Sequence, residues 1–104
     1  MRILSLLMLF VSTNVFCQLG VDSILKKGNE LQAQGRVNEA INIYNNAIKQ
    51  DSRNPEVYYY RGNAYFDLKN YKSAIADFNE CIKLNPKHLS AIYNRGLPQT
   101  FYWH

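Results

Sequence analysis

The side chains that could do chemistry in this 104-residue chain are few and widely spaced. Cys81, His88 and His104 lack the spacing that would hold a metal ion. Asp67 and Asp77 fall on different predicted helices, where we expect solvated charges, and no catalytic triad or phosphate loop stands out. The sequence therefore predicts no catalytic residue, no metal, no cofactor and no enzymatic activity.

Composition and charge bound what the chain could bind. Its formal net charge is +4, but the basic residues are scattered, and Lys26-Lys27 is their only adjacent pair. A nucleic-acid footprint needs Lys and Arg clustered along one face or groove, so we expect no nucleic-acid partner. Eight tyrosines and five phenylalanines are a large aromatic load, which could serve a core as well as a binding surface. The length allows one small domain.

The first seventeen residues have the layout of a secretory signal peptide. Arg2 supplies a positive charge, residues 3–11 are almost wholly apolar, and a polar break then leads to Cys17 before Gln18. A membrane-spanning helix needs about 20 apolar residues, so this run is too short to span. We expect cleavage after Cys17 and an exported protein, periplasmic or secreted. Two alternatives stay open: lipidation of Cys17, which alone would attach the chain to a membrane and which the bulky Phe16 disfavours, and a buried or interfacial helix.

The chain repeats itself every 34 residues. Gly28, Gly62 and Gly96 share this spacing, and further residues recur at the same offset. The identical pairs are Asn29 and Asn63, Ala40 and Ala74, Ile41 and Ile75, Asn45 and Asn79, Ile48 and Ile82, Lys49 and Lys83, Tyr59 and Tyr93, and Arg61 and Arg95. We therefore expect a first repeat over residues 21–54, a second over 55–88 and a truncated third from 89.

Each repeat is predicted to form two antiparallel helices. The later helix of the second repeat has apolar residues at intervals of three and four, which make one stripe on a helix. They are Tyr71, Ala74, Ile75, Phe78, Cys81 and Ile82. Gly35-Arg36 and Lys69-Asn70 are the predicted turns, and Asn54-Pro55 starts the second repeat. Glycine inside a helix costs about 1 kcal/mol relative to alanine, so Gly28 and Gly62 indicate that another backbone approaches closely there.

This pattern resembles the tetratricopeptide repeat. Residues 21–88 match two full copies of that motif, and a third copy matches over its first eight positions. The matching positions, which by resemblance pack the repeats, are Gly28, Leu31, Ala40, Tyr44 and Ala47 in the first copy, Tyr58, Gly62, Tyr65, Ala74, Phe78, Cys81 and Pro86 in the second, and Gly96 in the third. The resemblance implies an all-α fold in which antiparallel helix-turn-helix repeats stack into a short right-handed superhelix, an α-solenoid.

The third copy departs from the motif after Gly96. Pro98 falls where the helix should continue, and proline inside a helix costs about 3 kcal/mol and breaks the hydrogen-bond ladder. We expect helix only over residues 89–96, followed by an atypical tail that ends at His104. About three repeats are needed for stability, so we expect either self-association through an uncovered apolar surface or a cap formed by the aromatic tail.

The resemblance also implies a concave groove, lined by the first helix of each repeat, that binds an extended peptide. The residues that it places there are Leu25, Asn29, Gln32, Tyr59, Asn63, Phe66 and Tyr93. Asparagine amides can pair with a peptide backbone as donor and acceptor, and tyrosines supply contact area with few rotors to freeze. Periodicity does not separate this face from one that covers the neighbouring repeat, so both readings stay open for Tyr59 and Tyr93.

Some members of this family grip the carboxylate end of a chaperone with a fixed set of Lys and Asn residues. Asn63 and Asn94 stand at matching positions, but Tyr59 replaces the expected lysine, and export would separate the protein from cytosolic chaperones. The sequence thus predicts an exported module that binds another protein or an extended peptide. The alternative is a structural or assembly spacer within a larger envelope complex.

Overall fold

The computed structural model of the chain describes residues 20–102, with side chains over 20–98. Five helices and no strand make up this part of the chain. They are an N-terminal helix over residues 20–33, α2 (Val37–Gln50), α3 (Pro55–Asp67), α4 (Tyr71–Leu84) and α5 (Leu89–Tyr102). The signal peptide predicted at residues 1–17 lies outside the described residues, as do the side chains of the tail after Pro98. None of the described helices is long and apolar enough to cross a membrane.

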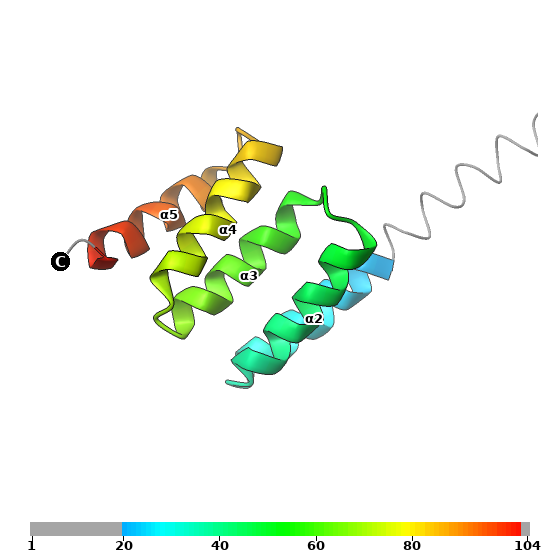
Figure 1. Cartoon of the computed structure of the whole chain (residues 1–104). Helices are drawn as coiled ribbons and strands as arrows, with labels where there is room; N and C mark the ends of the chain where they lie inside the picture. Colours follow the sequence, from blue (N-terminus) through cyan, green and yellow to red (C-terminus); the bar gives the residue numbers. More distant parts are fainter. Residues whose placement is uncertain (1–19, 103–104) are drawn as a thin grey trace, which may run out of the picture.

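The helices stack in sequence order, and α3 lies in the middle of the stack (Figure 1). It packs against α2 on one side and against α4 and α5 on the other. The buried residues form two clusters, one between the N-terminal helix, α2 and α3, and one between α3, α4 and α5. The predicted all-α repeat fold is therefore confirmed.

Polar side chains fix where α3 and α4 begin. Asn54 Oδ1 accepts a hydrogen bond from the backbone N–H of Glu56 at 3.1 Å, and Pro55 is the first residue of α3. Asn70 Oδ1 accepts a hydrogen bond from the backbone N–H of Ser73 at 3.4 Å at the start of α4. Each bond satisfies a backbone donor that has no partner inside its own helix, and this defines the first turn.

The turns within the two repeats share one backbone geometry. Gly35 has a φ of 79°, and the N–H of the next residue donates to the carbonyl oxygen of Leu31 at 2.9 Å. In the second repeat Lys69 takes the same place with a φ of 61°, and the N–H of the next residue donates to the carbonyl oxygen of Tyr65 at 2.9 Å. This is the left-handed helix ending that favours glycine, so Lys69 adopts it at a steric cost.

Gly28 and Gly62 each make room for an aromatic ring from the second helix of their own repeat. A Cβ on Gly62 would lie 2.7 Å from Cε1 of Phe78, and a Cβ on Gly28 would lie within 3.0 Å of the Tyr44 ring. The close neighbour is therefore a ring, and the expectation of a close backbone was wrong. Of the other predicted packing residues, those in the core are Ala40, Ala47, Tyr58, Ala74 and Cys81, with Leu31 and Tyr65 partly buried against it.

A buried ion pair within the second repeat positions an arginine that also bonds to the first repeat. Arg61 on α3 donates through Nε and Nη2 to the two carboxylate oxygens of Asp77 on α4, at 2.8 and 2.7 Å, and through Nη1 to Asn45 Oδ1 on α2 at 2.9 Å. The Asp77 side chain is 6% exposed, so the expectation of a solvated charge was wrong. Burial raises the pKa of the Asp77 carboxyl, and the bond to Arg61 opposes that rise. Arg95 Nη1 bonds Asn79 Oδ1 at 3.0 Å, so the link from arginine to asparagine recurs at the next repeat.

Three expectations for the C-terminal part need correction. First, α5 does not end before Pro98 but continues through it. The Pro98 ring is fully buried, and α5 packs against α4. This burial offsets the hydrogen bond to Asn94 that proline cannot make. Second, a Cβ on Gly96 would meet nothing within 4 Å, because no later helix in the described residues brings a ring to it. Third, Pro86 is exposed and follows Asn85, the C-cap of α4, so Pro86 does not pack between helices as expected.

Candidate functional site

A first hollow lies between the N-terminal helix and α3, with a volume of about 590 Å³. The N-terminal helix contributes one face, with residues spaced three and four apart, and α3 contributes two side chains from its first two turns. The lining residues are Asp22, Leu25, Lys26, Asn29, Glu30, Ala33, Glu56 and Tyr60. The repeat stacking thus leaves a depression between the first helices of consecutive repeats.

A second, smaller hollow of about 170 Å³ lies between α3 and α5. Its lining residues are Asn63, Phe66, Asp67, Phe78, Asn94 and Leu97. Glu56, Tyr60, Asn63 and Asp67 follow one another at intervals of four, three and four, so both hollows open along one face of α3. We use "the groove" for these two hollows together.

Two hydrogen bonds connect first helices across the groove. Asn94 Nδ2 on α5 donates to Asn63 Oδ1 on α3 at 2.9 Å. Gln32 Nε2 on the N-terminal helix donates to Asp67 Oδ2 on α3 at 2.8 Å. The polar side chains of the groove are therefore held in place before any ligand arrives, which lowers the entropy that binding must remove.

The two asparagines that repeat along the groove have different partners. Asn29 Oδ1 accepts a hydrogen bond from the Tyr44 hydroxyl at 2.6 Å, and the same hydroxyl lies 3.2 Å from Gln32 Oε1. Burial raises the pKa of Tyr44 to about 12, so this hydroxyl stays protonated and donates. Phe78 occupies the corresponding place in the second repeat and has no hydroxyl, so Asn63 takes its bond from the neighbouring repeat instead.

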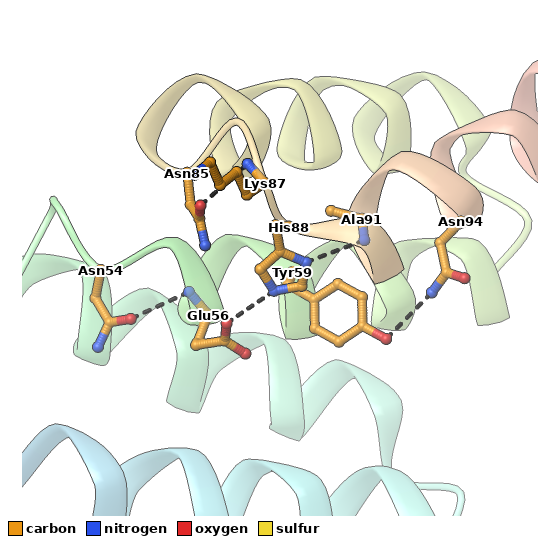
Figure 2. A network of polar contacts seen from close by, with 8 residues as sticks. All are labelled: Asn54, Glu56, Tyr59, Asn85, Lys87, His88, Ala91 and Asn94. Carbon is orange, nitrogen blue, oxygen red and sulfur yellow. Dashed lines mark hydrogen bonds and ion pairs between the residues drawn. The ribbon is translucent and has the colours of Figure 1, made fainter.

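Tyr59 lies beside His88 near the start of α5 (Figure 2), and it does not line either hollow. Its ring centroid is 4.8 Å from that of His88, and its hydroxyl accepts from Asn94 Nδ2 at 3.4 Å. His88 Nδ1 accepts the backbone N–H of Ala91 at 3.1 Å and so caps α5. A neutral ring must then carry its proton on Nε2, which lies 2.8 Å from Glu56 Oε1 and donates to it. Tyr59 therefore packs against the neighbouring repeat, which is one of the two alternatives that the sequence left open.

The other predicted groove residues divide between the groove and its surroundings. Those that line the hollows are Leu25, Asn29, Asn63 and Phe66. Leu25 is only 7% exposed and also belongs to the core between the N-terminal helix, α2 and α3. Gln32 lies at the edge and bonds Asp67. Tyr93 is 71% exposed and lines neither hollow.

Two residues of the groove, Lys26 and Tyr60, were not predicted, and each follows directly after a predicted groove residue. Lys26 follows Leu25, which also lines the groove, and Tyr60 follows Tyr59, which does not. Asn94 follows Tyr93 and was named in advance only as a position of the carboxylate grip. Successive residues lie about 100° apart around a helix, so an error of one position turns the predicted face toward the neighbouring repeat. Lys26, Tyr60 and Asn94 are also 34 apart, but they differ in type, so the pattern of identical pairs does not indicate that they share a face. The missed carboxylates are Asp22, Glu30, Glu56 and Asp67.

Two family models match the chain. The model described as "TPR repeat" matches residues 28–69, and the model described as "Tetratricopeptide repeat" matches residues 55–88. The second match has the bounds of the second repeat as predicted from the 34-residue period. Together the two models cover both helical pairs apart from the start of the N-terminal helix.

Known relatives carry the same repeat within much longer chains. The tetratricopeptide repeat and J domain-containing co-chaperone DNJ1 of Cryptococcus neoformans is 33% identical over 96 residues, which cover 89% of this chain and 18% of that protein. Human RNA polymerase II-associated protein 3 is 37% identical over 71 residues, which cover 68% of this chain and 11% of that protein. The chain thus spans less than a fifth of the length of these relatives.

Solved structures share the fold. The second TPR of Spaghetti (RPAP3), bound to the HSP90 peptide SRMEEVD, matches with a TM-score of 0.77 and 28% identity. The matched region covers 79% of this chain and 76% of that one. The second TPR domain of human RPAP3, in complex with an HSP70 peptide, has a TM-score of 0.78 and 27% identity, covering 83% of this chain and 72% of its own. The sequence models, the relatives and these structures agree, and the chain belongs to the tetratricopeptide-repeat family.

Proposed function

We propose that this chain binds an extended segment of another protein in its groove and does not act as an enzyme. The observation that carries the proposal is the row of groove amides from three successive first helices: Asn29, Asn63 and Asn94. An amide side chain offers both a donor and an acceptor, which is what a peptide backbone in extended conformation requires. Tyr60 and Phe66 flank this row and offer apolar contact area.

The similar structures support a peptide as the ligand, since two of them hold chaperone peptides. They do not identify the peptide for this chain. Tyr59 stands where the resemblance implies a lysine, and its ring packs against that of His88. We therefore propose peptide binding without the lysine-based grip on a carboxylate that the resemblance implies for some family members.

A peptide array followed by fluorescence anisotropy tests the proposal. The strongest array peptide should bind the chain, and Asn63→Ala should weaken that binding about twofold to tenfold, because one hydrogen bond contributes about 0.5–1.5 kcal/mol. Asn42→Ala is the matched control, since Asn42 is exposed on α2 away from the groove and the change in helix propensity is the same.

Circular dichroism must show equal helicity in both variants before the affinities are compared. Equal binding by Asn63→Ala and the parent chain would place the ligand elsewhere. Absence of any peptide ligand, together with a stable complex with a folded partner, would favour the spacer alternative.

Export also belongs to the proposal, and it rests only on the sequence pattern of residues 1–17. We propose that the signal is removed after Cys17 and that the protein acts in the periplasm or outside the cell. The intact mass of the mature protein tests this. A mass that still includes Met1 would contradict cleavage, and a diacyl adduct on Cys17 would establish lipid anchoring instead.

A further inference from the structure

The groove has a charge opposite to that of the chain as a whole. The chain has twelve Lys and Arg against eight Asp and Glu, a net charge of +4. Four of the eight carboxylates line the groove, whereas among the basic residues of the described part of the chain only Lys26 does so. The carboxylates are Asp22, Glu30, Glu56 and Asp67. The groove therefore attracts cations, although the net charge of the chain predicts the opposite.

The single cation of the groove is largely compensated by its own helix. Asp22 precedes Lys26 by four residues and Glu30 follows it by four. Side chains four apart on a helix are neighbours, so each carboxylate lies close enough to weaken the field of Lys26. Asp22 and Glu30 are both exposed and remain accessible to a ligand.

The two carboxylates on α3 are positioned by neighbouring repeats. Glu56 Oε1 is held by His88 Nε2 at 2.8 Å, while the Glu56 side chain is still 45% exposed (Figure 2). Asp67 Oδ2 is held by Gln32 Nε2 at 2.8 Å, and the residue is exposed. Both carboxylates are oriented without a cationic side chain of Lys or Arg to neutralise them, so they retain their attraction for an external cation.

Apolar surface lies between these charges. Leu25 and Tyr60 line the first hollow, and Phe66 and Leu97 line the second. Each hollow thus combines an apolar lining with carboxylates, of which Asp22, Glu30 and Glu56 lie in the first and Asp67 in the second. An extended peptide directs every second side chain toward the groove, so apolar side chains and lysines or arginines on that side can meet the apolar lining and the carboxylates, respectively.

We infer that the ligand of this groove is an extended, basic peptide segment that carries Lys or Arg between apolar residues. The inference rests on the proposed function and adds the chemical class of the ligand. It distinguishes this chain from the similar TPR domain bound to SRMEEVD, a peptide with three acidic residues and one arginine. Such a peptide would bring its carboxylates against those of the groove, and like charges repel.

Three end-capped peptides of equal length test the inference by fluorescence anisotropy with the full chain. The first has three lysines among alanines and valines, the second has glutamates in place of the lysines, and the third is SRMEEVD extended with alanine. We expect the lysine peptide to bind at least tenfold more tightly than either acidic peptide. Its affinity should fall as salt rises from about 0.05 to 0.5 M, because these contacts are exposed to screening.

A charge-matched pair of variants locates the effect. Asp22→Asn with Glu30→Gln should weaken binding of the lysine peptide about threefold to tenfold, as expected for two exposed ion pairs. Glu39→Gln with Glu80→Gln removes the same charge from outside the groove and should change the affinity less than twofold. Asp22 and Glu30 are both exposed on the N-terminal helix, so circular dichroism should show intact folding in both variants.

The outcomes separate the inference from the proposed function. Equal affinity for the lysine and glutamate peptides, stronger binding of SRMEEVD, or equal effects of the two double variants would overturn the basic-peptide inference while peptide binding itself stands. If neither these peptides nor the strongest array peptide binds, the proposed function fails and the inference fails with it.

Discussion

Gly62→Ala would place a methyl carbon 2.7 Å from Cε1 and 2.9 Å from Cδ1 of Phe78. An ordinary contact between such atoms is 3.4–4 Å, so the ring or the helices must move by about 0.7 Å. Phe78 is fully buried and packs in the core between α3, α4 and α5, so a shift of its ring disturbs that core. Overpacking of this kind costs about 2–3 kcal/mol.

Alanine is also more favourable than glycine inside a helix by about 1 kcal/mol, and this offsets part of the cost. We therefore expect Gly62→Ala to lower the free energy of unfolding by about 1–2 kcal/mol. For a domain of this size each 1 kcal/mol shifts Tm by about 4–8 °C. Thermal unfolding followed by far-UV circular dichroism measures the change directly.

Gly96→Ala is the matched control, because Gly96 occupies the same repeat position in α5 and a Cβ there meets nothing within 4 Å. It should raise the stability by about 0.5–1 kcal/mol, since only the helix propensity changes. If Gly62→Ala proves as stable as Gly96→Ala, the packing argument is wrong. Phe78→Leu should relieve the crowding, so its combination with Gly62→Ala should be more stable than the sum of the two single effects predicts.

Three further predictions concern the turn, the buried thiol and the surface of α5. Lys69→Gly should raise the free energy of unfolding by about 0.5 kcal/mol, because Lys69 has a φ of 61°. Gly35→Ala, at a φ of 79°, should lower the free energy of unfolding by about 1 kcal/mol. Equal thermal midpoints for the two variants would contradict this reading of the turn. Burial raises the pKa of Cys81 to about 11, so iodoacetamide should alkylate it far more slowly in the native chain than in denaturant at pH 8, and similar rates would show that the site opens readily. Leu89 and Tyr93 are 77% and 71% exposed, so light scattering across a concentration series should reveal association that Tyr93→Lys weakens; a monomer with a sharp melt at every concentration would refute self-association.

Local patterns in the sequence were sufficient to predict the repeat and the pairs of helices within it. A 34-residue period, an apolar stripe at intervals of three and four, and glycines at a fixed offset from aromatic residues all act within one repeat. Gly62 and Phe78 lie 16 residues apart, and the same spacing in each repeat gives each glycine its ring, as with Gly28 and Tyr44. The sequence therefore determined which helices pair, because the contacts that pair them recur with the period.

The partners of polar residues depended on the tertiary structure. Asp77 lies between Ala74 and Cys81 on the apolar stripe of α4, a position that could have signalled burial, but only the packed helices show that Arg61 reaches it. The course of α5 through Pro98 was likewise decided by packing, since the proline rule describes an isolated helix and the buried ring is a tertiary contact.

The groove shows the same division between sequence and structure. The period predicted that the first helices of successive repeats line up, and it placed Asn29 and Asn63 on the side that became the groove. It could not determine the rotation of each helix about its axis, because one residue turns the face by about 100° and several faces carry aromatic residues. Packing of α3 between its neighbours set that rotation, turned Tyr59 onto His88 and left Tyr60 and the carboxylates open to a ligand.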